Sequence, residues 1–572
     1  MAVSNSWKPR HAGLEALFEP EELEQLEKAR TAVSREGRTV IYCVYENPFA
    51  RAGGVAAVAA HLPPALREAG EQVILLTPFH RNLKTTPAYS ELNRVGDIKV
   101  PFGGAETAAE LFEHIDKVGN RWVFIQAWGM FDAAGGPDRT DPYSHALPEL
   151  LLRDALFACA AAPYAAAALG VGRNVVFHLQ DWQFATAALT VKQAVLAGVV
   201  ESAATVLTSH NPYDHPLPDR HLAYITDRLG PALWPLGEGT VYQRMIPLTD
   251  APLSTVSPNF ARELVQDQLQ TLHFAGHLQD VYEAHSVVGV NNPLFGEPKN
   301  PYTGAGTAKK NFAEKMRKRK AMLRVLANFE DERALGALDG GEGRPLTELP
   351  DDVPVFMMFG RLDPGQKGFD LLARAIEGFA LGEARFVLAP SVGEAGGPWV
   401  DDLARLAQRK KGDVVVYPFR MTSGYMETMA GASFIVMPSF YEPFGAATEA
   451  YLAGTPVVAR STGGLVDQVN DFRRTESTAT GLLFREKLPL GSSWPSIINA
   501  PTPAERVGIP LYAMMAEALF EALNQAAAIW KDDRPAYSKM LLNLFERATE
   551  FSGAASAHEY QSLYDIAASR RD

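Results

Sequence analysis

The stretch FIVMPSFYEPFGAATEAYLAGTPVVARSTGGLVDQVND, residues 434–471, decides the fold. Its apolar run at 434–437 predicts a buried parallel strand, and a short helix is expected over 446–453, ended by a glycine. A second strand is expected over 456–459, and it runs into the sequence STGG at 461–464, which opens another helix. Alternation of this kind predicts a parallel sheet with right-handed crossovers.

Both loops of this stretch follow the carboxyl end of a strand, where open parallel sheets bind their ligands. Gly463 and Gly464 can present bare N–H groups and a helix N-terminus to an anion. Glu442 places a carboxylate beside that anion site, which is unfavourable unless the carboxylate faces sugar hydroxyls. The pattern therefore indicates a nucleotide sugar; the alternative is that each glycine pair is only a tight turn.

Composition limits the class of protein. The chain has 572 residues, with 47% hydrophobic and 21% charged residues, which suits a soluble protein of two or three domains. The net charge of −13 disfavours nucleic-acid and membrane-surface partners. Cys43 and Cys159 lie in apolar runs, so we expect buried thiols in a reducing compartment and no zinc site.

Two segments bear on localisation. Residues 1–13 lack the apolar core of a signal peptide. The alanine-rich run 155–169 is interrupted by Pro163 and is expected to be too short to span a bilayer. The sequence therefore predicts a cytoplasmic protein without a membrane segment.

The first half of the chain repeats the strand–loop–helix arrangement. A strand over 39–45 leads into a loop that carries Arg51, Gly53 and Gly54, and a helix is expected over 55–68. The glycine pair again stands at a helix entrance, and Arg51 is a cation that could meet a phosphate. The alternative for Arg51 is a solvated side chain.

Polar residues also follow two later strands of this half. Asp181 comes just after a strand expected over 174–179, and His210 comes just after one expected over 205–208. A lone histidine is as often structural as catalytic, but its place at a strand end favours a site.

In the second half, Gly360 and Arg361 end a strand over 353–359, and Lys367 follows in the same glycine-flanked loop. Before it, a basic amphipathic helix is expected over 308–328. Its cationic cluster is expected to include a solvated face, the alternative being a glucan-docking or phosphate-sensing role; the cluster comprises Lys315, Arg317, Lys318, Arg319 and Lys320. The roles of that helix and of residues 1–38 are left open.

The predicted fold class is α/β, with two Rossmann-like domains facing each other across a deep cleft. The expected segments are an N-terminal arm (1–38), an N-terminal acceptor-side domain (39–300), an interdomain helix and linker (301–352), a C-terminal nucleotide-sugar domain (353–545) and a helical tail (546–572).

Read in order, several motifs together resemble the glycogen and starch synthases, which are retaining glycosyltransferases of the GT-B fold. The resemblance covers roughly residues 40–471 and is carried by Arg51-Ala-Gly-Gly-Val, His178-Leu-Gln-Asp-Trp, Ser209-His-Asn, Thr255-Val-Ser-Pro, Gly360-Arg-Leu with Gln366-Lys-Gly, and Tyr441-Glu-Pro-Phe-Gly with Ser461-Thr-Gly-Gly. It implies glucosyl transfer from ADP-glucose or UDP-glucose to an α-1,4-glucan with retention of configuration.

The resemblance also implies roles for individual residues. Arg361 and Lys367 would bind the diphosphate and stabilise its charge in place of a metal ion, so neither a metal nor a cofactor is expected. Glu442 would hold sugar hydroxyls and His210 would lie near the reacting face of glucose. The remaining substrate-binding positions would be Arg51, Gly53, Gly54, Asp181, Gly360, Gly445, Glu449, Thr462, Gly463 and Gly464.

The chain departs from the family pattern in places. Arg51 stands where the bacterial family usually has lysine, and Gln180 and Gln183 stand where histidines are common. Glu442 and Glu449 are seven positions apart, one fewer than in many GT-B enzymes. Two alternatives remain: a GT-B enzyme that makes a disaccharide or sugar phosphate, and a catalytically silent glucan-binding or regulatory protein. Homo-oligomerisation is left open.

Overall fold

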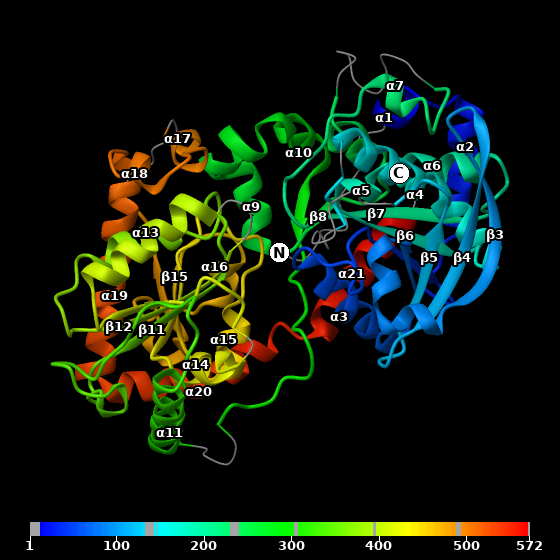
Figure 1. Ribbon diagram of the computed structural model, residues 1–572. Helices are drawn as coiled ribbons and strands as arrows, with labels where there is room; N and C mark the ends of the chain where they lie inside the picture. Colours follow the sequence, from blue (N-terminus) through cyan, green and yellow to red (C-terminus); the bar gives the residue numbers. More distant parts are fainter. Residues whose placement is uncertain are drawn as a thin grey trace. The chain divides into compact units, whose positions relative to one another are not determined.

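The computed structural model describes residues 12–131, 142–145, 147–228, 239–302, 307–392, 396–421, 423–487 and 493–569. The chain divides into two compact units (Figure 1). Unit 1 comprises residues 1–296 and 552–572, and unit 2 comprises residues 297–551. Each unit is described by itself below.

Unit 1 is built on a nine-stranded sheet in the order β3-β4-β5-β2-β1-β6-β7-β8-β9. The strands from β5 to β9 in that order run parallel, and β4 pairs antiparallel with both β3 and β5. Their bounds are β1 Thr39–Cys43, β2 Gln72–Pro78, β3 Asn93–Phe102, β4 Ala105–Ile115, β5 Arg121–Gln126, β6 Val175–Gln180, β7 Ala203–Ser209, β8 Leu253–Thr255 and β9 Val287–Gly289.

Helices cover this sheet (Figure 1). The α-helices of unit 1 are α1 Ala12–Glu15, α2 Pro20–Thr31, α3 Val55–Glu68, α4 Pro148–Ala168, α5 Asp181–Ala185, α6 Ala187–Leu196, α7 Asp219–Leu222, α8 Val241–Met245, α9 Pro258–Gln266, α10 Gln279–His285 and α21 Gly553–Ala568. The predicted strand–helix–strand unit around α3 is confirmed. The strand β4 was not predicted, because its sequence AETAAELFEHI is rich in the helix formers alanine and glutamate.

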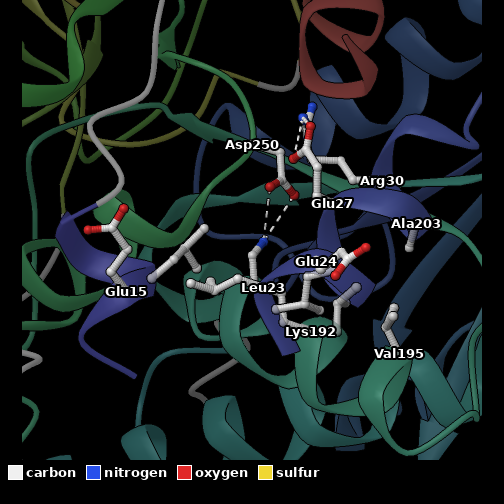
Figure 2. A pocket seen from close by; sticks show the side chains of 12 residues that line it. Glu15, Leu23, Glu24, Glu27, Arg30, Lys192, Val195, Ala203 and Asp250 are labelled. Atoms are coloured by element: carbon white, nitrogen blue, oxygen red, sulfur yellow. Dashed lines mark hydrogen bonds and ion pairs between the residues drawn. The ribbon is translucent and has the colours of Figure 1, made fainter. Parts of the chain in front are cut away.

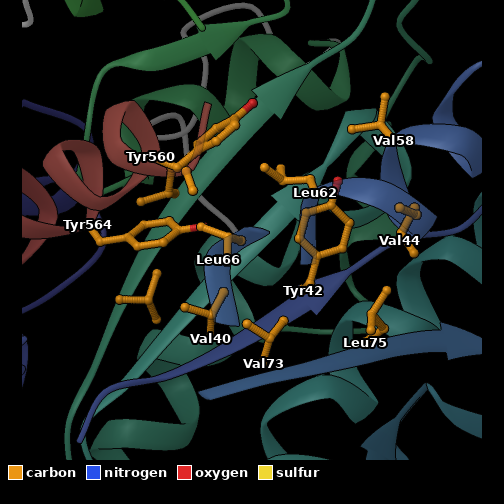
Figure 3. Packing of buried hydrophobic residues seen from close by; sticks show 14 of the residues in the cluster. Val40, Tyr42, Val44, Val58, Leu62, Leu66, Val73, Leu75, Tyr560 and Tyr564 are labelled. Atoms are coloured by element: carbon orange, nitrogen blue, oxygen red, sulfur yellow. The ribbon is translucent and has the colours of Figure 1, made fainter. Parts of the chain in front are cut away.

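The last helix of the chain, α21, completes the core of unit 1. Figure 3 shows Tyr560 and Tyr564 from α21 beside Val40 of β1 and Leu66 of α3. The hydroxyl of Tyr564 lies 2.9 Å from Nδ1 of the buried His178. Residues distant in sequence therefore form one apolar core, stabilised mainly by the removal of its surface from water.

The prediction that Pro163 interrupts the alanine-rich run is wrong. The helix α4 continues through Pro163 and has 21 residues. An interior proline normally kinks or ends a helix, but here the packing of the largely buried helix outweighs that local preference. Among the described residues, α4 is the one helix long and apolar enough to cross a membrane. Of its most apolar window 72% is buried inside the protein, as in the core helix of a globular domain. Cys43 and Cys159 are both buried free thiols, as predicted.

Unit 2 contains a seven-stranded sheet in the order β10-β13-β12-β11-β14-β15-β16. All neighbours run parallel except β10 and β13. The bounds are β10 Leu335–Gly336, β11 Val355–Arg361, β12 Arg385–Ser391, β13 Val414–Val416, β14 Phe434–Met437, β15 Val457–Arg460 and β16 Gly481–Phe484. The strands predicted over 353–359, 434–437 and 456–459 are confirmed as β11, β14 and β15, whereas the edge strands β10 and β16 were missed.

The helices of unit 2 alternate with these strands and then follow them. They are α11 Ala308–Ala327, α12 Phe369–Ile376, α13 Gly396–Arg409, α14 Tyr425–Gly431, α15 Ala447–Ala453, α16 Gly464–Gln468, α17 Trp494–Ile498, α18 Pro503–Arg506, α19 Pro510–Asp532 and α20 Arg534–Thr549.

The cationic cluster of α11 includes a solvated face, as predicted, at the exposed Arg317 and Lys320, whereas Lys315 and Arg319 are fully buried. Lys315 donates hydrogen bonds to the carbonyls of Ala430 and Gly454, and Arg319 donates to the carbonyl of Val353. These cations satisfy backbone carbonyls at the ends of neighbouring elements, which offsets the cost of burying their charge.

The five predicted segments and the two observed units divide the chain differently. The described part of the arm 1–38 packs within unit 1, while residues 1–11 lie outside the described residues. Residues 297–352 belong to unit 2, and the predicted tail 546–572 is shared between the units at Phe551 and Ser552. The predicted cleft between the two halves stays a prediction.

Candidate active site

In unit 2, three loops that follow β11, β14 and β15 bring predicted site residues together. Lys367 Nζ lies 2.6 Å from Glu442 Oε2, and both side chains are mostly buried. The same carboxylate oxygen accepts a hydrogen bond of 2.9 Å from the hydroxyl of Ser439. The site thus contains a cation and a carboxylate in direct contact, each on a different loop.

Gly463 and Gly464 pack directly against the loop of Glu442. A Cβ on Gly463 would lie 1.7 Å from the carbonyl oxygen of Glu442, and one on Gly464 would lie 2.2 Å from that of Phe444. Gly463 also has a φ of 49° and Gly464 donates its N–H to the Glu442 carbonyl at 3.0 Å. The glycine pair is therefore required by close backbone packing, and one of its N–H groups is used internally.

Arg361 and Gly360 end β11. The guanidinium of Arg361 is 61% exposed and donates a hydrogen bond of 3.4 Å to Gln366. Gly360 has a φ of 135°, in the region that favours glycine, and its Cβ position lies 4.0 Å from Cε of Lys367. This turn brings the two cationic residues of the loop to the same strand end, where the exposed Arg361 also lies 4.0 Å from the carboxylate of Asp363.

The other predicted residues of unit 2 surround this pair. Gly445 has a φ of 95°, and its Cβ position lies 3.2 Å from the Glu442 side chain. Thr462 is buried just before the glycine pair. Glu449 lies in the first turn of α15 and is partly exposed to solvent. Desolvation by the surrounding protein raises the pKa of its carboxyl, while the charge of Lys367 lowers it. Glu449 therefore belongs electrostatically to the same cluster.

In unit 1, the loop after β1 is organised by Glu46, which the sequence analysis missed. Its buried carboxylate accepts the N–H of Gly53 at 2.6 Å, the N–H of Ala56 at 3.3 Å and the hydroxyl of Tyr143 at 3.1 Å. A carboxylate is favourable at the N-terminus of α3. These N–H groups, which we had expected to face a phosphate, therefore already have an anion of the chain as partner.

Arg51 and Gly54 in the same loop are both exposed to solvent. A Cβ built on Gly54 would meet nothing within 4 Å, and its φ of −79° is accessible to any residue. Since neither the backbone nor packing in the protein requires glycine there, the missing side chain leaves room for a ligand beside Arg51.

Asp181 and His210 follow the adjacent strands β6 and β7 and contact each other. The Asp181 Oδ1 accepts the backbone N–H of His210 at 2.7 Å, and Asp181 has a φ of 55°, which is unusual for a residue with a side chain. Burial, together with the charge of Glu46, raises the pKa of Asp181 to about 7, although the hydrogen bond from the His210 N–H lowers it. Burial lowers the pKa of His210 to about 4, so its ring is neutral near pH 7.

Gln180 completes this group. The ring Nε2 of His210 lies 2.8 Å from Gln180 Oε1. The amide nitrogen of Gln180 is buried without a hydrogen-bond partner among the described residues. Such a donor is costly unless a ligand or water uses it. Its position as the last residue of β6 was the signal available in the sequence.

The structure therefore forms two groups of predicted residues: Arg361, Lys367, Glu442 and their glycines in unit 2, and Asp181 with His210 in unit 1. In the described ranges, no group of three or more His, Cys, Asp or Glu side chains could hold a metal ion.

A cavity of about 310 Å³ lies elsewhere in unit 1, between the N-terminal helices α1 and α2 and the helix α6. Figure 2 shows the amine of Lys192 directed at the carboxylate of Asp250, 3.0 Å away, with Glu27 and Arg30 of α2 nearby. None of the predicted site residues lines this cavity.

Comparison with known proteins gives two family matches. Residues 39–284 match the profile of the starch synthase catalytic domain, and residues 308–486 match that of family 4 glycosyltransferases in conflict systems. The chain is 29% identical to a glycogen synthase of Thermus thermophilus over 482 residues, covering 81% of this chain and 92% of that protein. It is also 29% identical to a glycogen synthase of Thioalkalivibrio sulfidiphilus, covering 91% and 97%.

Among solved structures, the chain is similar to the catalytic domain of starch synthase IV from Arabidopsis thaliana, which was solved bound to ADP and acarbose. The TM-score is 0.71 at 20% identity, covering 94% of this chain and all of that chain. This likeness confirms the predicted GT-B fold class.

Proposed function

We infer that this chain is a divergent member of the glycogen and starch synthase family and works as a glucosyltransferase. The observation that carries the inference is the contact of Lys367 with Glu442 in a GT-B unit, at the strand ends where such sheets bind ligands. The full-length similarity to glycogen synthases agrees with it.

The donor we propose is a nucleoside diphosphate glucose, either ADP-glucose or UDP-glucose. The starch synthase of similar fold was solved bound to ADP, which supports a nucleotide ligand for this chain. Arg361 is exposed and Lys367 lies in the same loop after β11, so both can approach the diphosphate. Their positive charge would stabilise the leaving group as the glycosidic bond breaks.

Glu442 would hold hydroxyls of the glucose and stabilise positive charge that develops on its ring. Ser439 orients the carboxylate by hydrogen bonding to it. In unit 1, neutral His210 and the unpaired amide of Gln180 would donate or accept hydrogen bonds to the sugar, and Gly54 would leave space for the donor. We propose that the acceptor is an α-1,4-glucan, that configuration is retained, and that no metal takes part.

A second candidate within the same fold is an enzyme that transfers glucose to a small sugar or sugar phosphate. The fold is shared with a sucrose-phosphate synthase from Thermosynechococcus elongatus, at a TM-score of 0.51 and 17% identity. The higher similarity to glycogen synthases favours the polymer acceptor over this candidate, and favours an enzyme over a silent glucan-binding protein.

The test is incubation of the purified chain with labelled ADP-glucose or UDP-glucose, with glycogen in one series and a panel of small sugars and sugar phosphates in another. Label in precipitated polymer supports glucan synthesis, and the more efficient donor identifies the base. Label only in a disaccharide or its phosphate would support the second candidate. Absence of transfer to every acceptor would contradict both.

A further inference from the structure

Beyond the sheet of unit 2, the short helices α17 and α18 contribute a buried arginine to the loop of Lys367. Arg506 is fully buried. Its Nη2 donates to the carbonyl of Pro364 at 2.7 Å, and its Nε donates to the carbonyl of Ile497 at 2.7 Å. Pro364 lies between Arg361 and Lys367, so the arginine fixes the middle of the loop that carries both cations.

The third nitrogen of Arg506 anchors this loop to the following helix. Nη1 lies 2.9 Å from Oδ2 of Asp370, in the first turn of α12. The same oxygen accepts a hydrogen bond of 2.9 Å from the hydroxyl of Tyr512 in α19. Both ends of the loop segment 364–370 are thereby held from outside the sheet.

Arg506 also contacts the loop that carries Glu442. Its guanidinium lies 5.1 Å from the ring centre of Phe440 and 4.5 Å from that of Trp399, distances at which a cation attracts an aromatic face. Phe440 donates its N–H to the carbonyl of Gln366 at 2.7 Å. The backbone hydrogen bond between Phe440 and Gln366 thus joins the two loops, and Arg506 contacts each of them, at Phe440 and at Pro364.

A second arginine, Arg460, fixes Phe440 through its carbonyl. Arg460 donates Nη1 to the carbonyl of Phe440 at 2.6 Å and lies over the ring of Trp494 in α17. Phe440 is therefore held at its N–H, at its carbonyl and at its ring, two residues before Glu442.

We propose that Arg506 is a positioning residue for glucosyl transfer, which fixes the loop of Lys367 relative to the loop of Glu442; this inference rests on the proposed function of those two side chains. A rigid fork is needed, because three nitrogens serve three different acceptors while the guanidinium also lies close to the rings of Trp399 and Phe440. Lysine has neither the geometry nor the stacking face.

The test compares Arg506→Met and Arg506→Lys with the matched control Arg319→Met. Arg319 is also fully buried in unit 2, donates to the carbonyls of Pro350 and Val353, and lies over Trp530 at 5.3 Å. Binding of ADP and UDP is measured by calorimetry, and kcat and KM are measured with the preferred donor, all well below the Tm of each variant.

We expect both Arg506 variants to lower kcat by about 100-fold, as misplacement of reacting groups by about 1 Å can do. Their affinity for the nucleoside diphosphate should fall, and amides of residues 361–367 should exchange hydrogen faster. Arg319→Met should lose Tm and keep kcat, nucleotide affinity and loop protection. If Arg506→Met does not fold, the same measurements on Arg506→Lys test the proposal.

The proposal is overturned if the Arg506 variants keep wild-type kcat and nucleotide affinity, or if Arg319→Met changes both as strongly. Failure of the proposed function gives a different result: the wild-type protein then binds neither nucleotide and transfers no glucose. In that case hydrogen exchange of the loop still decides whether Arg506 positions it.

Discussion

Lys367 and Glu442 form an ion pair of 2.6 Å although each is assigned a different part of the donor. The lysine is proposed for the diphosphate and the carboxylate for the sugar. The hydroxyl of Ser439 gives Glu442 a second partner on the same oxygen. When Lys367 turns to a phosphate, Glu442 therefore keeps one hydrogen bond that fixes its orientation.

This arrangement predicts opposite effects of one substitution on binding and on turnover. Glu442→Gln should lower kcat by about 10²–10³-fold, because the charge that stabilises the sugar is lost. The same variant should bind free ADP or UDP more tightly, because Lys367 is no longer paired with a carboxylate. Glu427→Gln is the matched control, since Glu427 is an exposed carboxylate of α14 in the same unit and is not one of the predicted site residues. Unchanged turnover in Glu442→Gln would remove this residue from the mechanism.

Two glycine substitutions should separate packing from ligand binding. Gly463→Ala places a Cβ 1.7 Å from the Glu442 carbonyl in a left-handed backbone, so we expect a large loss of Tm and of nucleotide binding. In Gly54→Ala the added Cβ has no protein atom within 4 Å, so this variant should keep its Tm. If the donor approaches this loop, Gly54→Ala should nonetheless raise the donor KM. An unchanged KM would place the donor elsewhere.

The periodic and glycine-bounded parts of the chain were predictable from sequence. The helix over 55–68 and the strand over 434–437 match the observed α3 and β14, because apolar runs with clear ends determine them locally. The strand β4 was not predictable in this way, because its alanines and glutamates favour a helix and only pairing with β3 and β5 makes it a strand.

The site residues also divide into those that local sequence motifs indicate and those that only tertiary contacts reveal. Lys367 and Glu442 were accessible through motifs, since each follows a strand end in the sequence. Glu46 and Arg506 were not, because their importance lies in which backbone groups they reach across the fold. The burial of Lys315 was not predictable for the same reason: an amphipathic pattern does not show that carbonyls of other elements lie against the buried face.

The proposed charge stabilisation by Arg361 and Lys367 predicts that activity does not need a divalent ion. Glucose transfer should be the same after dialysis against EDTA and after addition of magnesium or manganese. Arg361→Met should instead lower kcat strongly in all of these conditions, since a neutral side chain cannot stabilise the diphosphate. Loss of activity in EDTA that magnesium restores would contradict the proposal.

The pKa of Asp181 predicts how the stability of the protein depends on pH. Burial raises this pKa to about 7, from about 3.9 in an unfolded chain. Between about pH 4 and pH 7 the native protein therefore holds a proton that the unfolded chain has lost, so the free energy of unfolding falls as pH rises through this range.

Asp181→Asn removes that dependence and keeps an oxygen for the His210 N–H. The free energy of unfolding of the variant relative to wild type should therefore increase from about pH 5 to about pH 8, by up to about 3 kcal/mol. Neutral His210 and His178, whose pKa values burial lowers to about 4 and about 3, give a stability loss in acid that both proteins share. Urea titrations at several pH values measure the difference. Parallel curves for the two proteins would show that Asp181 is ionised in the native state well below pH 7, because an ordinary carboxyl gives no slope in this range.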